Sequence, residues 1–403
     1  MADHQELANS GQAPEVASLQ TRGMILGGIG LALCAAGYMA DSARFFEAYL
    51  VGYLYWLAIS LGCLGWTMIH HLTDGNWGFP VRRVWESGAR TIWLMALLFI
   101  PILLAGDHLF PWMAEGALED HIIAGKAGYL NTTFFSIRAL LYFVIWGGMA
   151  LILTSTSYKQ DSEGPEPLGV RLRLTSGPGL LIMAITVTFS ATDWAMSIDP
   201  HWFSTIWGFL FAASDLLAAM AFTICIAKML EHCPPLNKAL TTDTFHDLGN
   251  LLMAFTMLWA YMSFSQFLII WSGNTQEEAP WYLLRMDNGW IIISVILIVF
   301  HFMIPFTVLL TRKTKRAANV LVKVAIFMLM MRFIDLYWLT MPTLTAHGEH
   351  GAGFHPSWID IAPWLGVGGL WLFFFSMQLR ERPLTPLTDP RLQQALEGTG
   401  GHH

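Results

Sequence analysis

The sequence predicts an all-α polytopic membrane protein with about ten transmembrane helices. Of its 403 residues, 55% are hydrophobic and only 13% are charged. Soluble domains carry roughly 45–50% apolar and about 25% charged residues, so this chain has too few charges to cover a water-exposed surface of its size. The apolar runs are long and continuous, which excludes the alternating strands of a membrane barrel.

A helix needs roughly 20 residues to cross the hydrocarbon core of a bilayer. Pro101 interrupts the third apolar run, and proline is tolerated in a spanning helix when neighbouring groups satisfy the carbonyl that it frees. We expect the chain to cross the membrane in the runs Met24–Ala40, Phe45–His70, Thr91–Gly106, Thr132–Thr154, Gly179–Ile198, Phe203–Leu230, Leu248–Trp271, Trp290–Leu310, Ala317–Met341 and Trp358–Leu379.

These runs divide the chain into a polar tail (1–21), a ten-helix transmembrane domain (22–380) and a C-terminal tail (381–403). Most lysines and arginines fall in the tails and in the loops after even-numbered runs, whereas the other loops carry only Arg44, Lys126 and Arg285. Because positively charged loops stay in the cytoplasm, we expect both tails to be cytoplasmic. The loops are too short to fold as a soluble domain, so a soluble catalytic domain would belong to another chain.

Composition and spacing argue against several classes of site. The four cysteines are far apart and form no CxxC or zinc-ligand spacing. A membrane cytochrome needs paired histidines on facing helices, and only His301 lies deep in an apolar run. The net charge of −7 argues against binding nucleic acid. We therefore expect no metal site, no bound cofactor and no catalytic residue in this chain.

Ionisable residues inside the apolar runs are the strongest candidates for function, because burying each one costs roughly 2.5–3.5 kcal/mol on insertion scales. Thr186, Ser190, Asp193 and Ser197 are spaced by 4, 3 and 4 residues, which places them on one helical face. Such a stripe of hydroxyls leading to a carboxylate can hold a file of water and pass protons. The alternative is a packed polar stripe in which Asp193 bonds to a neighbouring helix.

Two arginines also fall inside runs. Arg138 requires an anionic partner, for which Asp193 and Asp335 are both plausible. Arg332 lies three residues before Asp335 on one helical face, so the two either form a structural salt bridge or serve in function.

Other polar groups extend the pattern along the membrane normal. Asp215 and His301 lie near mid-depth, and Gln266 shares a helical face with Thr256 and Ser263. Read together, these groups predict an outer and an inner half-path for protons. The inner half-path would include residues near run ends, namely His70, His71, Lys228, His246, Asp247 and Lys323.

Three segments carry a resemblance to a known family: Thr188–Phe211 (TFSATDWAMSIDPHWFSTIWGFLF), Trp259–Asn274 (WAYMSFSQFLIIWSGN) and Pro280–Arg285 (PWYLLR). The chain resembles the smaller of the two polytopic subunits of bacterial alternative complex III. That subunit is similar to the NrfD and polysulfide-reductase membrane anchors. The resemblance extends over nearly the whole chain and implies two four-helix bundles with flanking helices.

The resemblance implies a role in a respiratory complex of the bacterial inner membrane. Such a complex oxidises menaquinol or ubiquinol and passes electrons to a cytochrome c or a terminal oxidase. The implied partners are a larger NrfD-like subunit, an iron–sulfur subunit and a multihaem cytochrome c subunit, which carry the clusters and the c-type haems. The smaller subunit is expected to support the membrane core and to conduct protons.

Two alternatives stay open at this point. The chain could itself bind quinol, using Asp193, His301 or Arg332 to exchange the quinol protons. It could also be a proton-coupled secondary transporter, although the paired interrupted helices typical of that class are not evident in the sequence.

Overall fold

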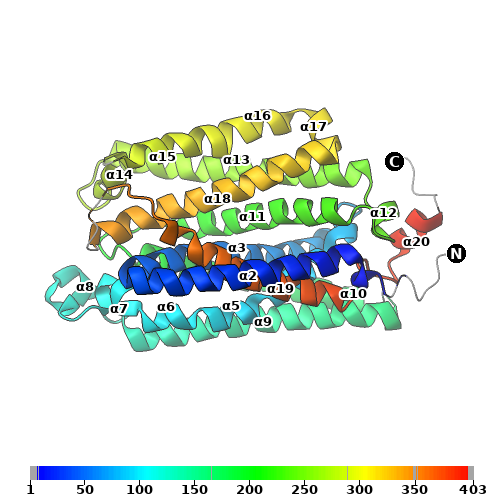
Figure 1. Cartoon of the computed structure of the whole chain (residues 1–403), viewed down its shortest axis with the longest axis horizontal. Helices are drawn as coiled ribbons and strands as arrows, with labels where there is room; N and C mark the ends of the chain where they lie inside the picture. Colours follow the sequence, from blue (N-terminus) through cyan, green and yellow to red (C-terminus); the bar gives the residue numbers. More distant parts are fainter. Residues whose placement is uncertain are drawn as a thin grey trace.

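The computed structural model describes residues 7, 9–164, 166–287, 289–347, 351 and 353–397, and this part of the chain contains helices and no strand. The long helices lie side by side in one elongated bundle (Figure 1). We call one end terminal, where α2 (Pro14–Ala40) begins and where α12 (Leu236–Ala239) and α20 (Pro390–Glu397) lie. The other end, which holds α8 (His121–Lys126) and α14 (Ala279–Met286), is called distal.

Nine helical segments within the described residues are long and apolar enough to cross a membrane, which confirms the predicted class of all-α polytopic membrane protein. A tenth long helix, α18 (Ala318–His347), runs among them (Figure 1). The nine segments are Pro14–Ala40 (α2), Ser42–Thr73 (α3), Phe79–Leu104 (η2 and α4–α6), Thr132–Glu163 (α9), Leu168–Met196 (α10 and η5), Trp207–Leu230 (α11), Thr242–Gly273 (α13), Trp290–Leu310 (α15, η6 and α16) and Trp358–Arg380 (η7 and α19).

The helices form two groups of four with a flanking pair, as expected. The first bundle consists of α3, α4–α6, α9 and α10, and the second consists of α11, α13, α15–α16 and α18. Helices α2 and α19 (Ala362–Arg380) pack mainly against each other, and both also contact α3. The two bundles meet where α3 contacts α11.

Helix α3 lies at the centre, and its most apolar stretch is buried along its whole length. It approaches α11 so closely that a Cβ atom on Gly62 would lie 2.1 Å from the backbone oxygen of Asp215. Small residues allow such backbone contact between membrane helices. Glycine is therefore required at position 62, and this contact fixes the two bundles relative to each other.

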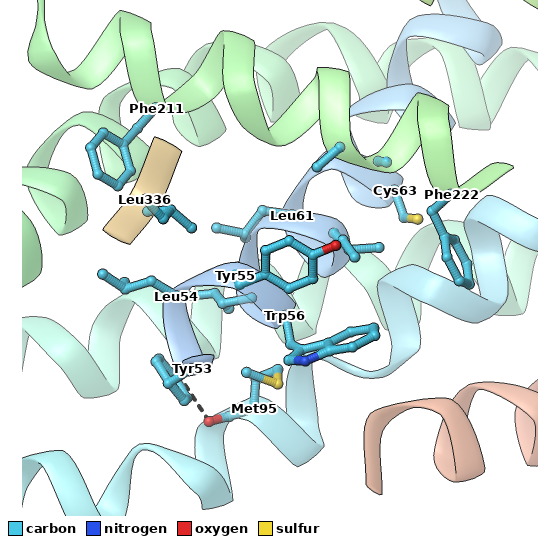
Figure 2. Close-up of a cluster of buried hydrophobic side chains, with 14 of the residues drawn as sticks. Tyr53, Leu54, Tyr55, Trp56, Leu61, Cys63, Met95, Phe211, Phe222 and Leu336 are labelled. Atoms are coloured by element: carbon cyan, nitrogen blue, oxygen red, sulfur yellow. Dashed lines mark hydrogen bonds between the residues drawn. The ribbon is translucent and has the colours of Figure 1, made fainter. Parts of the chain in front are cut away.

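Aromatic side chains of α3 connect it to its neighbours (Figure 2). The Tyr53 hydroxyl donates to the backbone oxygen of Met95 at 3.0 Å, and the Trp56 indole donates to that of Trp364 at 2.9 Å. The Tyr55 hydroxyl donates to the backbone oxygen of Leu329 at 3.2 Å. Each large ring is buried while its polar tip keeps a partner, which is how such side chains stabilise an interior.

Several predicted boundaries were wrong. Helix α2 begins at Pro14, so residues 14–21 of the expected polar tail are helical; proline suits a first helical turn because its missing N–H would have no partner there. The third span begins at Phe79 and not at Thr91, because the polar helix α4 (Arg82–Arg90) extends it towards the terminal end with its charges paired in the interior. Residues 1–6, 8 and 398–403 of the two predicted tails lie outside the described residues.

Candidate functional sites in the two bundles

A buried ion pair occupies the distal half of the first bundle. Asp193 is fully buried and accepts from Arg138 with both carboxylate oxygens, at 2.8 Å from Nε and 2.9 Å from Nη2. The Tyr142 hydroxyl donates to the same carboxylate at 2.8 Å. We call Arg138, Tyr142 and Asp193 the distal site. Of the two partners expected for Arg138, the structure selects Asp193.

Local structure at the start of α9 positions the arginine. The Arg138 guanidinium stacks on the Tyr129 ring, with 3.8 Å between its central carbon and the ring centroid. Its Nη1 also donates to the backbone oxygen of Tyr129 at 2.9 Å. The cation is thus fixed by an aromatic face, a carbonyl and a carboxylate, which together offset the cost of burying its charge.

Asp193 lies in a π-helical segment, η5 (Thr192–Met196), that ends α10 (Leu168–Ala191). The wider turn shows in the hydrogen bond from the Ser197 N–H to the Thr192 oxygen, five residues back, at 2.9 Å. Such π segments occur frequently at functional sites. The predicted regular α-helical spacing therefore does not hold at the carboxylate.

The four residues of the predicted hydroxyl stripe are all buried. Thr186 accepts from the Trp146 indole at 2.8 Å, while Ser190 and Ser197 donate to the carbonyls of Val187 and Asp193. All three hydroxyl groups thus donate to backbone oxygens of their own helical segment. The hydroxyl oxygens of the two serines still have lone pairs that can accept a hydrogen bond.

A distal pocket of about 420 Å³ opens beside this site. Ser197 and Tyr129 line the pocket and also contact the distal site, because Ser197 bonds Asp193 and Tyr129 bonds Arg138. Lys126 closes one side by donating to the Pro200 carbonyl at 2.6 Å. The distal site is therefore fully buried yet borders a cavity through two of its neighbours.

A second buried ion pair lies in the second bundle. Arg332 pairs with Asp335 one helical turn along α18, and the Trp259 indole donates to the same Asp335 oxygen at 3.1 Å. The His301 ring stacks on Trp259 with their centroids 4.1 Å apart. We call Trp259, His301, Arg332 and Asp335 the central site, because these residues lie well inside their helices.

Several polar atoms of the central site have no hydrogen-bond partner within the described part of the chain. They are both ring nitrogens of His301 and the Nε and Nη2 atoms of Arg332. On neighbouring α11, the hydroxyl of Ser214 is likewise unpartnered, and Asp215 lies within electrostatic reach of Arg332. Buried polar groups nearly always bond to protein or water, so this region has capacity to bind water or an exchanging proton.

The central site also contains a π-helical segment, η6 (Leu297–Met303), which carries His301. Pro305 follows four residues after His301 and has no N–H to donate to the His301 carbonyl. Proline thus explains why the regular helix is interrupted beside the histidine. Asp193 and His301, in separate bundles, both lie on π segments.

Gln266 does not join either site. It lies at the distal end, where its amide oxygen accepts from Ser204 at 3.0 Å and its nitrogen approaches the Tyr282 hydroxyl at 3.3 Å. Nearby, Arg285 lies in the connection between two spans, as expected, and its side chain is fully buried. It donates to the carbonyls of Trp338 and Leu339, the first of which loses its helical partner because Pro342 has no N–H. Arg285 therefore provides a donor to the carbonyl that Pro342 leaves without its helical partner.

The sequence did not single out a third polar cluster, at the terminal end of the first bundle. Arg82 and Arg83 of α4 both pair with Glu86, and Arg83 also pairs with Asp161 of α9. Ser157 accepts from both arginines, at 2.7 and 2.9 Å. In the sequence, Glu86 follows Arg82 by four residues and Arg83 by three, a spacing that indicates ion pairs on one helical face. Because these arginines lie between two predicted apolar runs, they were expected to be loop charges and not members of a buried ion-pair cluster.

This terminal cluster borders a terminal pocket of about 460 Å³. His70 and His71 line it and are buried, and the Nδ1 of His70 and Nε2 of His71 have no partner in the described residues. Asp74 lies at its edge. Burial raises the pKa of Asp74, but the adjacent Arg391 guanidinium outweighs burial and holds that pKa below its usual 3.8. The carboxylate therefore stays charged at physiological pH.

No group of three metal-ligating side chains occurs among the residues that the structure covers. A comparison with models of known protein families finds no match, and no curated protein matches the chain. The chemistry of the sites is that of buried carboxylates, imidazoles and hydroxyls, with one cavity beside the distal site and another beside His70 and His71.

Proposed function

We propose that this chain is an integral membrane subunit of a quinol-oxidising respiratory complex of the alternative complex III type. In this proposal it supports the membrane core and conducts protons, while partner subunits carry the haems and iron–sulfur clusters. The assignment to that complex depends on the three sequence segments that resemble its smaller polytopic subunit. The proton-conducting role depends on one observation, the buried Arg138–Asp193 pair beside the distal pocket.

A buried ion pair in an apolar bundle is weak evidence for stability, because apolar side chains of similar size usually serve as well. Intramembrane ionisable residues more often mark a path for ions or protons. Asp193 can take up a proton when its pairing with Arg138 loosens. The Tyr142 hydroxyl donates to its carboxylate, and the Ser197 hydroxyl donates to its backbone oxygen. Ser197 lines the distal pocket, and a water molecule or a side-chain rearrangement would have to connect the carboxylate to its hydroxyl.

The central and terminal groups would continue the path. His301 and Asp335 are the titratable groups of the central site, and His70 and His71 border the terminal pocket. With the terminal end in the cytoplasm, protons would enter at the histidine pair and leave at the distal pocket. Rearranging side chains or bound water would have to connect these groups, since transfer needs a hydrogen-bonded contact at each step.

The distal pocket favours one alternative, that this chain binds quinol itself. Its volume falls within the range of small-molecule sites, and its walls combine aromatic and apolar side chains with a few polar groups. A quinol ring there would lie close to Ser197 and Tyr129, the residues that contact the distal site. Labelling with a photoreactive quinone analogue separates the two possibilities: cross-links to Tyr129 or Trp202 support binding here.

The proposal is tested by purifying the chain from its native membrane in mild detergent, followed by mass spectrometry, a haem spectrum and a quinol-oxidation assay. We expect co-purification with a multihaem c-type protein and an iron–sulfur protein, together with quinol-oxidising activity. A colourless, single protein without partners would contradict the assignment and make the proton-coupled transporter the leading interpretation.

A further inference from the structure

The C-terminal segment returns to the terminal end of the first bundle after α19 (Figure 1). Residues 386–391 of this segment form one wall of the terminal pocket. The opposite walls come from the ends of α3 and α9 and the start of α10. Residues distant in sequence therefore enclose the histidine pair jointly.

Three sets of hydrogen bonds hold the segment in place. The Leu387 N–H donates to Asp161 at 3.0 Å, and the Thr388 hydroxyl donates to the Gln160 carbonyl at 2.7 Å. Arg391 donates from Nη1 to the Asp74 carboxylate and the Gly75 carbonyl, both at 2.7 Å. Every partner lies at the mouth of the terminal pocket or at the last turns of α9.

Leu384 is buried in the main core, but beyond it the apolar anchor of the segment is small and separate. Leu392 of α20 packs with Phe79 and Ala239 in a cluster of its own. The ion pair beside it is partly exposed, since the Asp74 side chain retains 58% of its accessible surface. Partly exposed pairs contribute little stability, and regions with few apolar contacts open at low cost. The segment therefore makes specific contacts, but the free energy that keeps it in place is small.

We propose that residues 386–391 act as a closure that can open and that controls access to His70 and His71 in the terminal pocket. When closed, Arg391 bridges the segment to Asp74 and Gly75 across the mouth. When open, the histidines face the aqueous phase of that side. The closure itself follows from contacts in this chain; only the identity of what passes, a proton, rests on the proposed function.

Access is measured by the rate at which a small thiol reagent modifies a cysteine placed inside the pocket. Leu172 lines the pocket and is 3% exposed, so Leu172→Cys in the full chain, in native membranes, provides the probe. Adding Arg391→Ala removes the bridge, and we expect the rate to rise several-fold, because the hydrogen bonds of a partly exposed ion pair are lost. Thr388→Val should raise it by a smaller factor in the same direction.

Arg380→Ala is the matched control, since Arg380 donates to Gln20 on an exposed surface away from the pocket and should leave the rate unchanged. Cys63 is fully buried, so its modification reports unfolding and separates a misfolded variant from an opened one. If the Leu172→Cys probe reacts equally fast alone, with Arg391→Ala and with Thr388→Val, the closure is overturned. That outcome would leave the respiratory assignment untouched, because the labelling does not depend on quinol or on partner subunits.

Discussion

The distal and central sites contain the same kind of ion pair but differ in how completely its atoms are used. In the distal site both oxygens of Asp193 are bonded, and the guanidinium of Arg138 has a carboxylate, a carbonyl and a ring as partners. In the central site two nitrogens of Arg332 and both nitrogens of His301 have no partner among the described residues. A proton that enters the distal site must displace an existing bond to Asp193, whereas the unmet hydrogen-bonding capacity of the central site can bind water or a proton directly.

The largest expected effect on stability comes from removing the Arg138 cation of the distal site. Arg138→Leu leaves Asp193 buried without a counter-charge, and we expect a loss of about 3–5 kcal/mol in the free energy of unfolding. Thermal denaturation of the purified protein measures it. The double variant Arg138→Leu with Asp193→Leu should recover most of the loss. If the single variant melts like the parent, the distal pair is not the closed unit described here.

A smaller loss in the free energy of unfolding is expected when Asp193 keeps its pairing with Arg138 but loses the hydrogen bond from Tyr142. Tyr142→Phe removes one hydrogen bond to Asp193, and bonds to charged groups contribute about 1.5–3 kcal/mol. Tyr53→Phe serves as a comparison, since its hydroxyl donates to a neutral carbonyl and should cost about 1 kcal/mol. Equal losses in the two variants would show that the Asp193 carboxylate is not charged in the folded protein.

The central site should behave in the opposite way. His301→Leu removes no hydrogen bond made within the described chain, so we expect the free energy of unfolding to change by less than about 1 kcal/mol. Proton transfer through the protein should nevertheless fall. A strong destabilisation by this variant would mean that the histidine holds a structural partner and that the two sites are alike.

The smallest effect concerns pH at the terminal pocket. The pKa of Asp74 lies below its usual 3.8 in the folded chain, so its contact with Arg391 stabilises the closed segment above that pH and is lost as the pH falls through the lower, folded value. Because Asp74 stays charged near neutrality, its titration should not change the labelling rate at Leu172→Cys in that pH range. Asp74→Asn should accelerate labelling at neutral pH, and an unchanged rate would remove Asp74 from the closure.

The fold was predictable because few backbone structures can satisfy their own hydrogen bonds inside a bilayer. The ten predicted apolar runs correspond, among the described residues, to the nine apolar spans and to α18, and continuous hydrophobicity separated helix from barrel. Boundaries failed where polar residues lie inside helices: Arg82 and Arg83 look like loop charges in the sequence, but Glu86 and Asp161 neutralise them in the interior. Pairing between separate helices is a tertiary property that local composition does not reveal.

The candidate sites were predictable only in part. The cost of burying charge singled out Arg138, Asp193, Arg332 and Asp335, and the pairing of Arg138 followed from the need for a counter-charge. The π segments at Asp193 and His301 could not be anticipated, because α-helical spacing was assumed throughout. The terminal pocket also depends on residues 386–391, which return from the far end of the sequence.

Proton conduction through Asp193 is the central claim, and counting protons per quinol tests it most directly. The purified complex, reconstituted in vesicles with quinol and an electron acceptor, would be compared with Asp193→Asn, whose amide oxygen can still accept from Arg138. Thr188→Val, which lies outside the hydroxyl stripe and loses only a hydrogen bond to the Ala184 carbonyl of its own helix, is the control. We predict that Asp193→Asn oxidises quinol but translocates fewer protons per quinol than the parent and the control. An unchanged ratio would contradict the claim.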